Sequence, residues 1–231
     1  MCEHLIFIPS QLCTAAVWRT QIDALRGEVH IAVANQREHD SMGRLAESIL
    51  DAAPAHFALA AHGMGGFIAF EIWRRAAGRV KQLALFDTLA AADTPSQTAR
   101  REMYAVLARE GKFEQVIESR LPLLLHADRQ DDAQLLAIVR TMAADTGVEA
   151  FLRQQRAIID RADSRPDLAA IDCPTLVVIG RDDRITSVAD AQLIAGTIPG
   201  AQLEIIESCG HLVPLEAPHR ATALLRDWLH L

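Results

Sequence analysis

The chain has 231 residues, a length that fits one domain with a sizeable buried core and leaves little room for a second. Its formal charge is −7, from 23 Lys and Arg against 30 Asp and Glu, and no run of basic residues stands out. We therefore expect no nucleic acid and no anionic membrane surface as a partner, and a small-molecule substrate instead.

The four cysteines, Cys2, Cys13, Cys173 and Cys209, lie far apart and show no CxxC spacing. They predict neither a disulfide framework nor a metal site, so we expect reduced thiols, no metal and no cofactor. The first residues lack a signal-peptide pattern, and no apolar run approaches the roughly 18 residues that cross a bilayer. A cytoplasmic protein is expected, and its oligomeric state stays open.

Apolar runs and helical periodicities alternate over the first ninety residues. Strands are predicted at 4–9, 29–34, 57–62 and 80–86, and helices at 14–26, 41–50 and 67–77. This alternation is typical of a mostly parallel sheet with right-handed crossovers, flanked by helices.

From about residue 90 to 168 the alternation stops and the composition is helical almost throughout. A helical block inserted between two strands of an α/β sheet is best interpreted as a lid over the strand ends. The alternation then resumes, with strands predicted at 175–179 and 202–206 and helices at 189–198 and 218–231. We expect a single domain, 1–231, that carries this lid.

The stretch FALAAHGMGG, Phe57–Gly66, predicts a strand, a very tight turn and a helix. It resembles the GHSMGG nucleophile elbow of the α/β-hydrolase family at every position but two. Ala61 stands for the first glycine, which is a mild change. Gly63 stands where the nucleophilic serine should be, and this change removes the reacting atom.

Two later stretches also resemble motifs of this family, and each follows a predicted strand. Gly180–Arg184 is similar to the family's G-x-x-D loop, which implies that Asp183 orients and charges the histidine. Ser208–Glu216 is similar to its G-H loop, which implies His211 as general base. The order of nucleophile position, acid and base matches that of the family. Asp87 also follows a strand and remains an alternative acid.

The resemblance also implies an oxyanion hole made by the backbone amides of Met64 and Gln11. Pro9-Ser10-Gln11 replaces the common His-Gly-x of the family's first loop, and the Gln11 amide is still available. His62 is expected to pack rather than to act as a base. Neither Cys13 nor Cys209 lies on the elbow, so we expect no cysteine nucleophile.

The implied parent activity is a serine esterase, thioesterase or lactonase that uses a catalytic triad on a small substrate. Because Gly63 cannot form an acyl-enzyme, we expect the chain as written to be inactive. Three accounts stay open. In the first, the serine of an active hydrolase was replaced deliberately to trap a substrate. In the second, the chain is a natural pseudoenzyme that binds a small molecule or partner under the lid. In the third, Gly63 leaves room for a water that His211 deprotonates.

Overall fold

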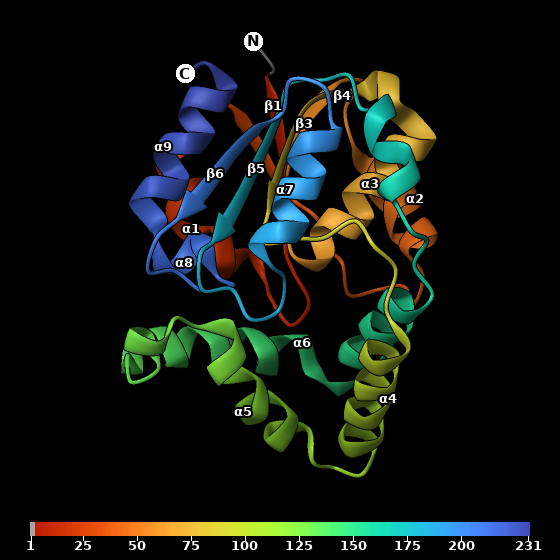
Figure 1. Ribbon diagram of the computed structural model, residues 1–231, viewed down its shortest axis with the longest axis vertical. Coiled ribbons are helices and arrows are strands. Elements are labelled where there is room, and N and C mark those ends of the chain that lie inside the picture. Colours follow the sequence, from red (N-terminus) through yellow and green to blue (C-terminus); the bar gives the residue numbers. More distant parts are fainter. Residues whose placement is uncertain (1–2) are drawn as a thin grey trace.

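The computed structural model describes residues 3–231, so Cys2 lies outside the described part. Within this part, one sheet has the strand order β2-β1-β3-β4-β5-β6, and every neighbouring pair is parallel (Figure 1). The mostly parallel sheet flanked by helices is thus confirmed. The strands are β1 His4–Ile8, β2 His30–Val33, β3 Phe57–His62, β4 Val80–Phe86, β5 Thr175–Gly180 and β6 Gln202–Ile206.

The central strands are apolar on both faces because helices cover both sides of the sheet. All six residues of β3 are buried. In β1, Ile6 and Ile8 pack into one core cluster, and Leu5 and Phe7 pack into the other. This two-residue alternation places one hydrophobic core on each face of the sheet.

Helices α2, α3 and α7 cover one face and α1 and α9 the other. The predicted helix over 14–26 is divided into a 3-10 turn and α1. The helices are α1 Arg19–Leu25, α2 Met42–Ala52, α3 Met64–Ala76, α4 Pro95–Arg109, α5 Phe113–Leu124, α6 Ala133–Ile159, α7 Val188–Thr197, α8 Val213–Glu216 and α9 Pro218–Leu229, with 3-10 turns at Ala15–Trp18, Ala77–Arg79, Ala127–Arg129 and Arg165–Ala170.

Helices α4 to α6, here called the helical block (residues 95–159), lie together beyond the ends of the strands (Figure 1). The longest of them, α6, is kinked at Gly147, whose φ of 74° lies in the region that favours glycine. At its return to the sheet, Arg161 donates to Asp93 at 2.6 Å and to the Ala91 carbonyl. These contacts fix the end of the block to the chain that enters it.

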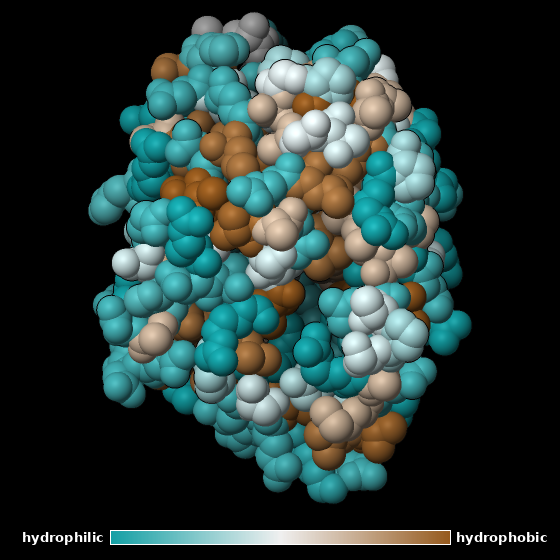
Figure 2. All heavy atoms as spheres, in the orientation of Figure 1, coloured by the Kyte–Doolittle hydropathy of each residue, from teal (hydrophilic) through white to brown (hydrophobic). Residues whose placement is uncertain are grey.

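Figure 2 shows apolar side chains gathered over β6 and α7 on the face that it presents. Leu193 of α7 is 43% exposed, and the β6 residues are only partly buried. Strand β6 is a sheet edge, and the polar residues Gln202 and Glu204 discourage pairing with another chain. No helix within residues 3–231 combines the length and hydropathy that a membrane crossing requires.

Candidate active site

The turn between β3 and α3 has the sharp geometry that its sequence predicts. Gly63 has φ 52° and ψ −114°, a conformation that residues with a β-carbon rarely adopt. Its N–H donates to the Phe86 carbonyl at 2.9 Å, and its own carbonyl accepts from the Thr88 hydroxyl at 2.8 Å. The elbow (residues 62–66) is therefore held between β3 and β4, at the carboxyl ends of both strands.

His211 and Asp183 meet at this edge of the sheet. Asp183 Oδ2 lies 2.8 Å from His211 Nδ1, and both side chains are buried. The other oxygen of Asp183 accepts from the amides of Ile185 and Thr186, at 2.7 and 3.0 Å, and the Thr186 hydroxyl bonds Oδ2. The carboxylate thus fixes the imidazole so that Nδ1 carries the proton and Nε2 is free to accept one.

The charge state of Asp183 follows from these partners. Burial alone would raise the pKa of its carboxyl, but the charge and hydrogen bond of His211 and the donors of Thr186 hold that pKa below the usual value. His211 Nε2 lies 3.3 Å from the point where a residue other than glycine would carry its β-carbon at position 63. The accepting nitrogen therefore faces the elbow.

Asp87, the alternative acid, is also buried nearby but makes different bonds. Its oxygens accept from the amides of Gly180 and Val213, at 3.0 and 3.2 Å, and one lies 3.5 Å from His62 Nε2. Burial, together with the charge of Asp183, raises the pKa of Asp87 well above its usual value. The geometry therefore places Asp183, rather than Asp87, on the imidazole of His211.

His62 lies beneath His211 and is fully buried. Its Nε2 donates to the His211 carbonyl at 2.8 Å, and its ring makes an edge contact with Trp18. Burial and the neighbouring His211 lower the pKa of His62 to about 3. His62 is therefore neutral near pH 7 and supports the loop that carries His211.

The two amides assigned to an oxyanion hole differ in their hydrogen-bond partners. The Met64 N–H donates to the Ser10 hydroxyl at 3.2 Å. Within residues 3–231 the Gln11 N–H has no acceptor, so it is available to a ligand. The loop that carries Gln11 is held by Gln36, whose side chain donates to the carbonyls of Ser10 and Cys13 at 2.9 and 2.8 Å.

A narrow, mostly enclosed pocket extends from Ser10 and His211 toward the helical block. Helices α5 and α6 supply its apolar wall, with Ile117, Leu121, Val139 and Ala143. Cys13 also lines the pocket, but burial raises the pKa of its thiol to about 12, so the reactive thiolate is absent at neutral pH.

Arg120 brings a positive charge into this pocket. It is 9% exposed, and its Nη1 donates to Gln11 Oε1 at 2.7 Å. Burial lowers the pKa of its guanidinium to about 10, which leaves it charged at neutral pH. No carboxylate of residues 3–231 lies within ion-pair distance, and the buried Nε has no hydrogen-bond partner. The pocket thus has a positive charge that the described chain does not neutralise.

Sequence reasoning missed three residues of this site: Ser10, Gln36 and Arg120. Ser10 carried a signal, because it stands where the family's first loop commonly has glycine. Arg120 and Gln36 carried none, since a charged or polar residue on a helix or loop is usually solvated. Two other arginines of the helical block do not face the pocket with a free charge. Arg140 pairs with Glu118, and Arg153 donates to the Arg37 carbonyl.

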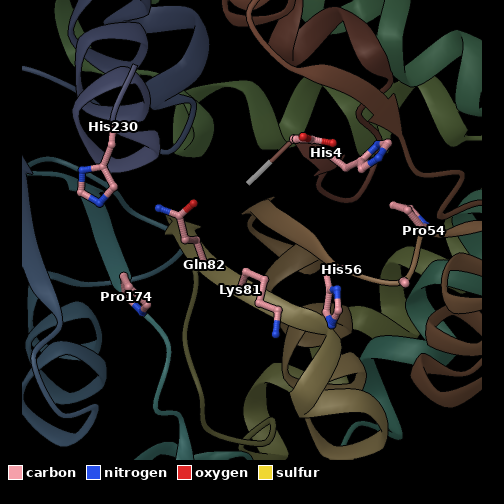
Figure 3. Close-up of a pocket in the computed structure, with 9 residues that line it drawn as sticks. His4, Pro54, His56, Lys81, Gln82, Pro174 and His230 are labelled. Atoms are coloured by element: carbon pink, nitrogen blue, oxygen red, sulfur yellow. The ribbon is translucent and has the colours of Figure 1, made fainter. Parts of the chain in front are cut away.

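A wide depression lies at the opposite end of the sheet, near the strand starts, with a volume of about 650 Å³. Figure 3 shows that His230 lies across it from His4 and His56, so the three rings do not converge. Within residues 3–231 no group of three or more His, Cys, Asp or Glu is arranged to hold a metal ion. The chemistry-bearing residues therefore gather at the elbow and not in this depression.

Comparison with known proteins is consistent with this geometry. The model of the alpha/beta hydrolase family matches residues 6–224, so the chain belongs to this family. The predicted α/β-hydrolase fold is thereby confirmed.

The relatives include esterases and a lipase. Pimeloyl-[acyl-carrier protein] methyl ester esterase of Nitrosomonas europaea is 27% identical over 195 residues, which cover 78% of this chain and 74% of the esterase. Monoacylglycerol lipase abhd6-A of Xenopus laevis is 41% identical, but over only 59 residues, 26% of this chain and 18% of the lipase. The chain therefore spans less than a fifth of that lipase.

Among solved structures, a thermophilic esterase from Thermogutta terrifontis, in a malate-bound form, superposes with a TM-score of 0.89 at 25% identity. The superposition covers 98% of this chain and 89% of the esterase. The chain thus shares nearly its whole fold with that esterase.

Proposed function

We propose that this protein hydrolyses a small carboxylic ester, thioester or lactone. The observation that carries the proposal is the Asp183–His211 hydrogen bond of 2.8 Å, which leaves the accepting nitrogen of the imidazole facing the elbow. A general base held in this way, beside the backbone amides of Met64 and Gln11, is the arrangement that acyl transfer requires.

Each residue has a role in this proposal. His211 accepts the proton of the attacking oxygen, and Asp183 keeps the imidazole oriented and stabilises its charged form. The amides of Met64 and Gln11 hold the negative charge that develops on the carbonyl oxygen. Gly63 occupies the nucleophile position without contributing a reacting atom.

The unneutralised charge of Arg120 supports a substrate that carries a carboxylate group in addition to the bond that is cleaved. A buried guanidinium gains most from a carboxylate that accepts two of its N–H groups. The malate bound to the structurally similar esterase is a dicarboxylate, which agrees with this substrate charge.

The position of the helical block supports the proposal that residues 90–168 form a lid. Its α5 and α6 supply the apolar wall of the pocket, so the block shapes the space for the substrate's acyl or alcohol part. The pocket is mostly enclosed and has a volume of only about 20 Å³, which favours a small molecule over a macromolecule. We also propose that the protein lies in the cytoplasm.

The second candidate is a pseudoenzyme that binds a small carboxylate without hydrolysing it. One observation favours it, since Gly63 has no side chain at the position where the family motif carries serine. This candidate uses the same pocket and Arg120, and it differs from the first only in the absence of turnover.

The test is a panel of activated short-chain esters, thioesters and lactones, each with and without a free carboxylate. We expect turnover of carboxylate-bearing members, and a loss of at least about a thousandfold in kcat for His211→Ala. His219→Ala, at an exposed histidine, is the matched control. Binding of these compounds, seen as a thermal shift without turnover, would favour the pseudoenzyme.

A further inference from the structure

The hydroxyl of Ser10 lies in the space that a side chain at position 63 would occupy. A β-carbon at position 63 would lie 2.1 Å from Ser10 Oγ and 2.9 Å from Ser10 Cβ. Ser10 follows β1 and Gly63 follows β3, and these strands are neighbours in the sheet, with Ile8 paired to Ala61. The side chain of one loop therefore fills the position left open in the other.

Two groups that an elbow serine uses, the Met64 amide and the His211 imidazole, lie near Ser10 Oγ. It accepts from the Met64 N–H at 3.2 Å, so it lies beside the first oxyanion amide. His211 Nε2 lies 3.3 Å from the position that a β-carbon of residue 63 would take, and Ser10 Oγ lies close to the same position. Ser10 and His211 both line the enclosed pocket, and both are nearly buried.

The loop that presents Ser10 is held firmly in place. The Ser10 carbonyl accepts from the Gln36 side chain at 2.9 Å and from the Cys13 N–H at 3.2 Å. Leu12 N–H donates to the buried Gln154 of α6 at 3.2 Å. A side chain on a loop held by Gln36 and Gln154 from outside, and by a turn bond within, is positioned accurately enough for catalysis.

We infer that Ser10 is the catalytic nucleophile of this chain, which exchanges serine and glycine between its first loop and its elbow relative to the family motif. The inference rests on the proposed function, because it names the attacking atom of that hydrolysis. In the resting structure the Ser10 hydroxyl accepts a hydrogen bond from the Met64 N–H. Catalytic hydrogen bonds often tighten only when substrate is bound.

The reaction proceeds in two halves. Ser10 Oγ bonds to the substrate carbonyl carbon while its proton passes to His211 Nε2, and the carbonyl π electrons move onto the oxygen. As it attacks, the hydroxyl releases the Met64 amide, which then holds this oxygen together with Gln11. The leaving oxygen or sulfur departs with the proton from His211. Water, deprotonated by His211, next attacks the acyl carbon and frees Ser10, which regains a proton.

The first experiment requires no variant. The protein is treated with a fluorophosphonate, which loses fluoride when an activated serine attacks its phosphorus, and the labelled peptide is mapped by mass spectrometry. We expect one adduct, on Ser10. The His211→Ala substitution should suppress it.

The second experiment removes the hydroxyl. Ser10→Ala should lower turnover of the best ester of the panel by at least about a thousandfold and abolish labelling. Ser164→Ala is the matched control, since Ser164 is also buried but its hydroxyl accepts from Arg74 and does not line the pocket. Circular dichroism and the melting temperature show whether each variant is folded.

The third experiment moves the hydroxyl back. Ser10→Gly combined with Gly63→Ser relieves the crowding and should restore turnover to within about a hundredfold of the original chain. The fluorophosphonate adduct should then be found at position 63. Gly63→Ser alone should be weaker, because both β-carbons compete for one space.

The outcomes separate this inference from the proposed function. If Ser10→Ala retains turnover that His211→Ala loses, the nucleophile inference is wrong and the hydrolase proposal stands with water as attacker. If Ser10 is labelled but no panel compound is hydrolysed, the nucleophile stands and the proposed substrate class fails. If Ser10 is not labelled and nothing is hydrolysed, both are wrong.

Discussion

Arg120 is a buried, charged residue of the pocket that has no carboxylate partner in the described chain. Burying a guanidinium without a carboxylate costs desolvation free energy that few contacts offset, since only Gln11 Oε1 accepts from Arg120. Such a residue weakens the free protein and stabilises a complex with an anion. Its retention in a nearly closed pocket is understandable when the ligand supplies the missing charge.

Arg120→Met should therefore affect affinity more than catalysis. For an ester that carries a free carboxylate we expect KM to rise about 10–100-fold, the equivalent of a lost charged hydrogen bond, with kcat changed far less. For a neutral ester of the same size KM should change little. Steady-state kinetics on the pair of esters measures this, and an equal rise for both would show that Arg120 only shapes the pocket.

His62 makes stability depend on pH in a defined direction. Its pKa falls from an ordinary value of 6.5 to about 3 in the fold, mainly through burial and next through His211. Between these values the unfolded chain binds a proton that the folded chain does not. Stability should therefore fall as pH drops below 6.5, by up to about 1.4 kcal/mol per pH unit from this residue.

The variant His62→Gln should flatten that dependence. Urea denaturation from pH 7 to pH 4 gives the free energy of unfolding for the variant, and the exposed His219→Gln serves as control. The raised pKa of Asp87 opposes the trend, so the informative quantity is the difference between the slopes of original chain and variant. Equal slopes would show that His62 does not resist protonation.

The order of the motifs predicts that His211 and Asp183 lie together, because the carboxyl ends of parallel strands meet at one edge of a sheet. The exchange between Ser10 and Gly63 was visible as two departures from the family motifs. Their closeness was not, since it depends on the register of β1 against β3 and on the path of each turn.

At the scale of elements, the elbow depends on how closely α3 approaches β1. A β-carbon at Gly65 would lie 2.3 Å from the Ile8 carbonyl oxygen, a backbone atom that cannot move aside. Gly65→Ala should lower the free energy of unfolding by about 2–3 kcal/mol. Gly78→Ala, where no heavy atom lies within 4 Å, should change it by about 0.5 kcal/mol or less.

Chemical denaturation of the two glycine variants measures this difference. Similar stabilities would mean that α3 can shift away from β1, and the elbow would then be less constrained than its geometry indicates. The Gly65 variant should also lose activity, because the Met64 amide moves with the start of α3.

Strand and helix positions followed from periodicity over most of the chain, since apolar runs and helical spacing differ clearly in an α/β sheet. The interior of the helical segment followed less well. Its composition predicted helices, but the kink of α6 depends on Gly147 alone, and an isolated glycine inside a helical pattern does not indicate whether the helix bends.

At the scale of the whole molecule, the helical block is attached through a buried ion pair. Asp93 is 1% exposed at its side chain and bonds both Arg161 and Arg101 at 2.6 Å. Asp93→Asn should lower stability by about 3 kcal/mol, because two guanidinium groups lose their counter-charge. Glu118→Gln, in the exposed pair with Arg140, should cost about 1 kcal/mol or less.

Hydrogen exchange locates the effect. Amides of residues 95–159 should exchange faster in Asp93→Asn, whereas those of β3 and β4 should keep their protection. Uniformly faster exchange would indicate that the helical block and the sheet unfold as one unit rather than separately.

The contact between positions 10 and 63 also restricts how this chain can change by single mutations. Serine at both positions crowds two β-carbons into one space, and glycine at both leaves no hydroxyl, so each single step between the two arrangements is disfavoured. Evolution from one arrangement to the other by single mutations must pass through one of these two disfavoured variants. Among natural relatives with this loop, serine at one position should therefore accompany glycine at the other, and relatives with serine at both positions or glycine at both should be scarce.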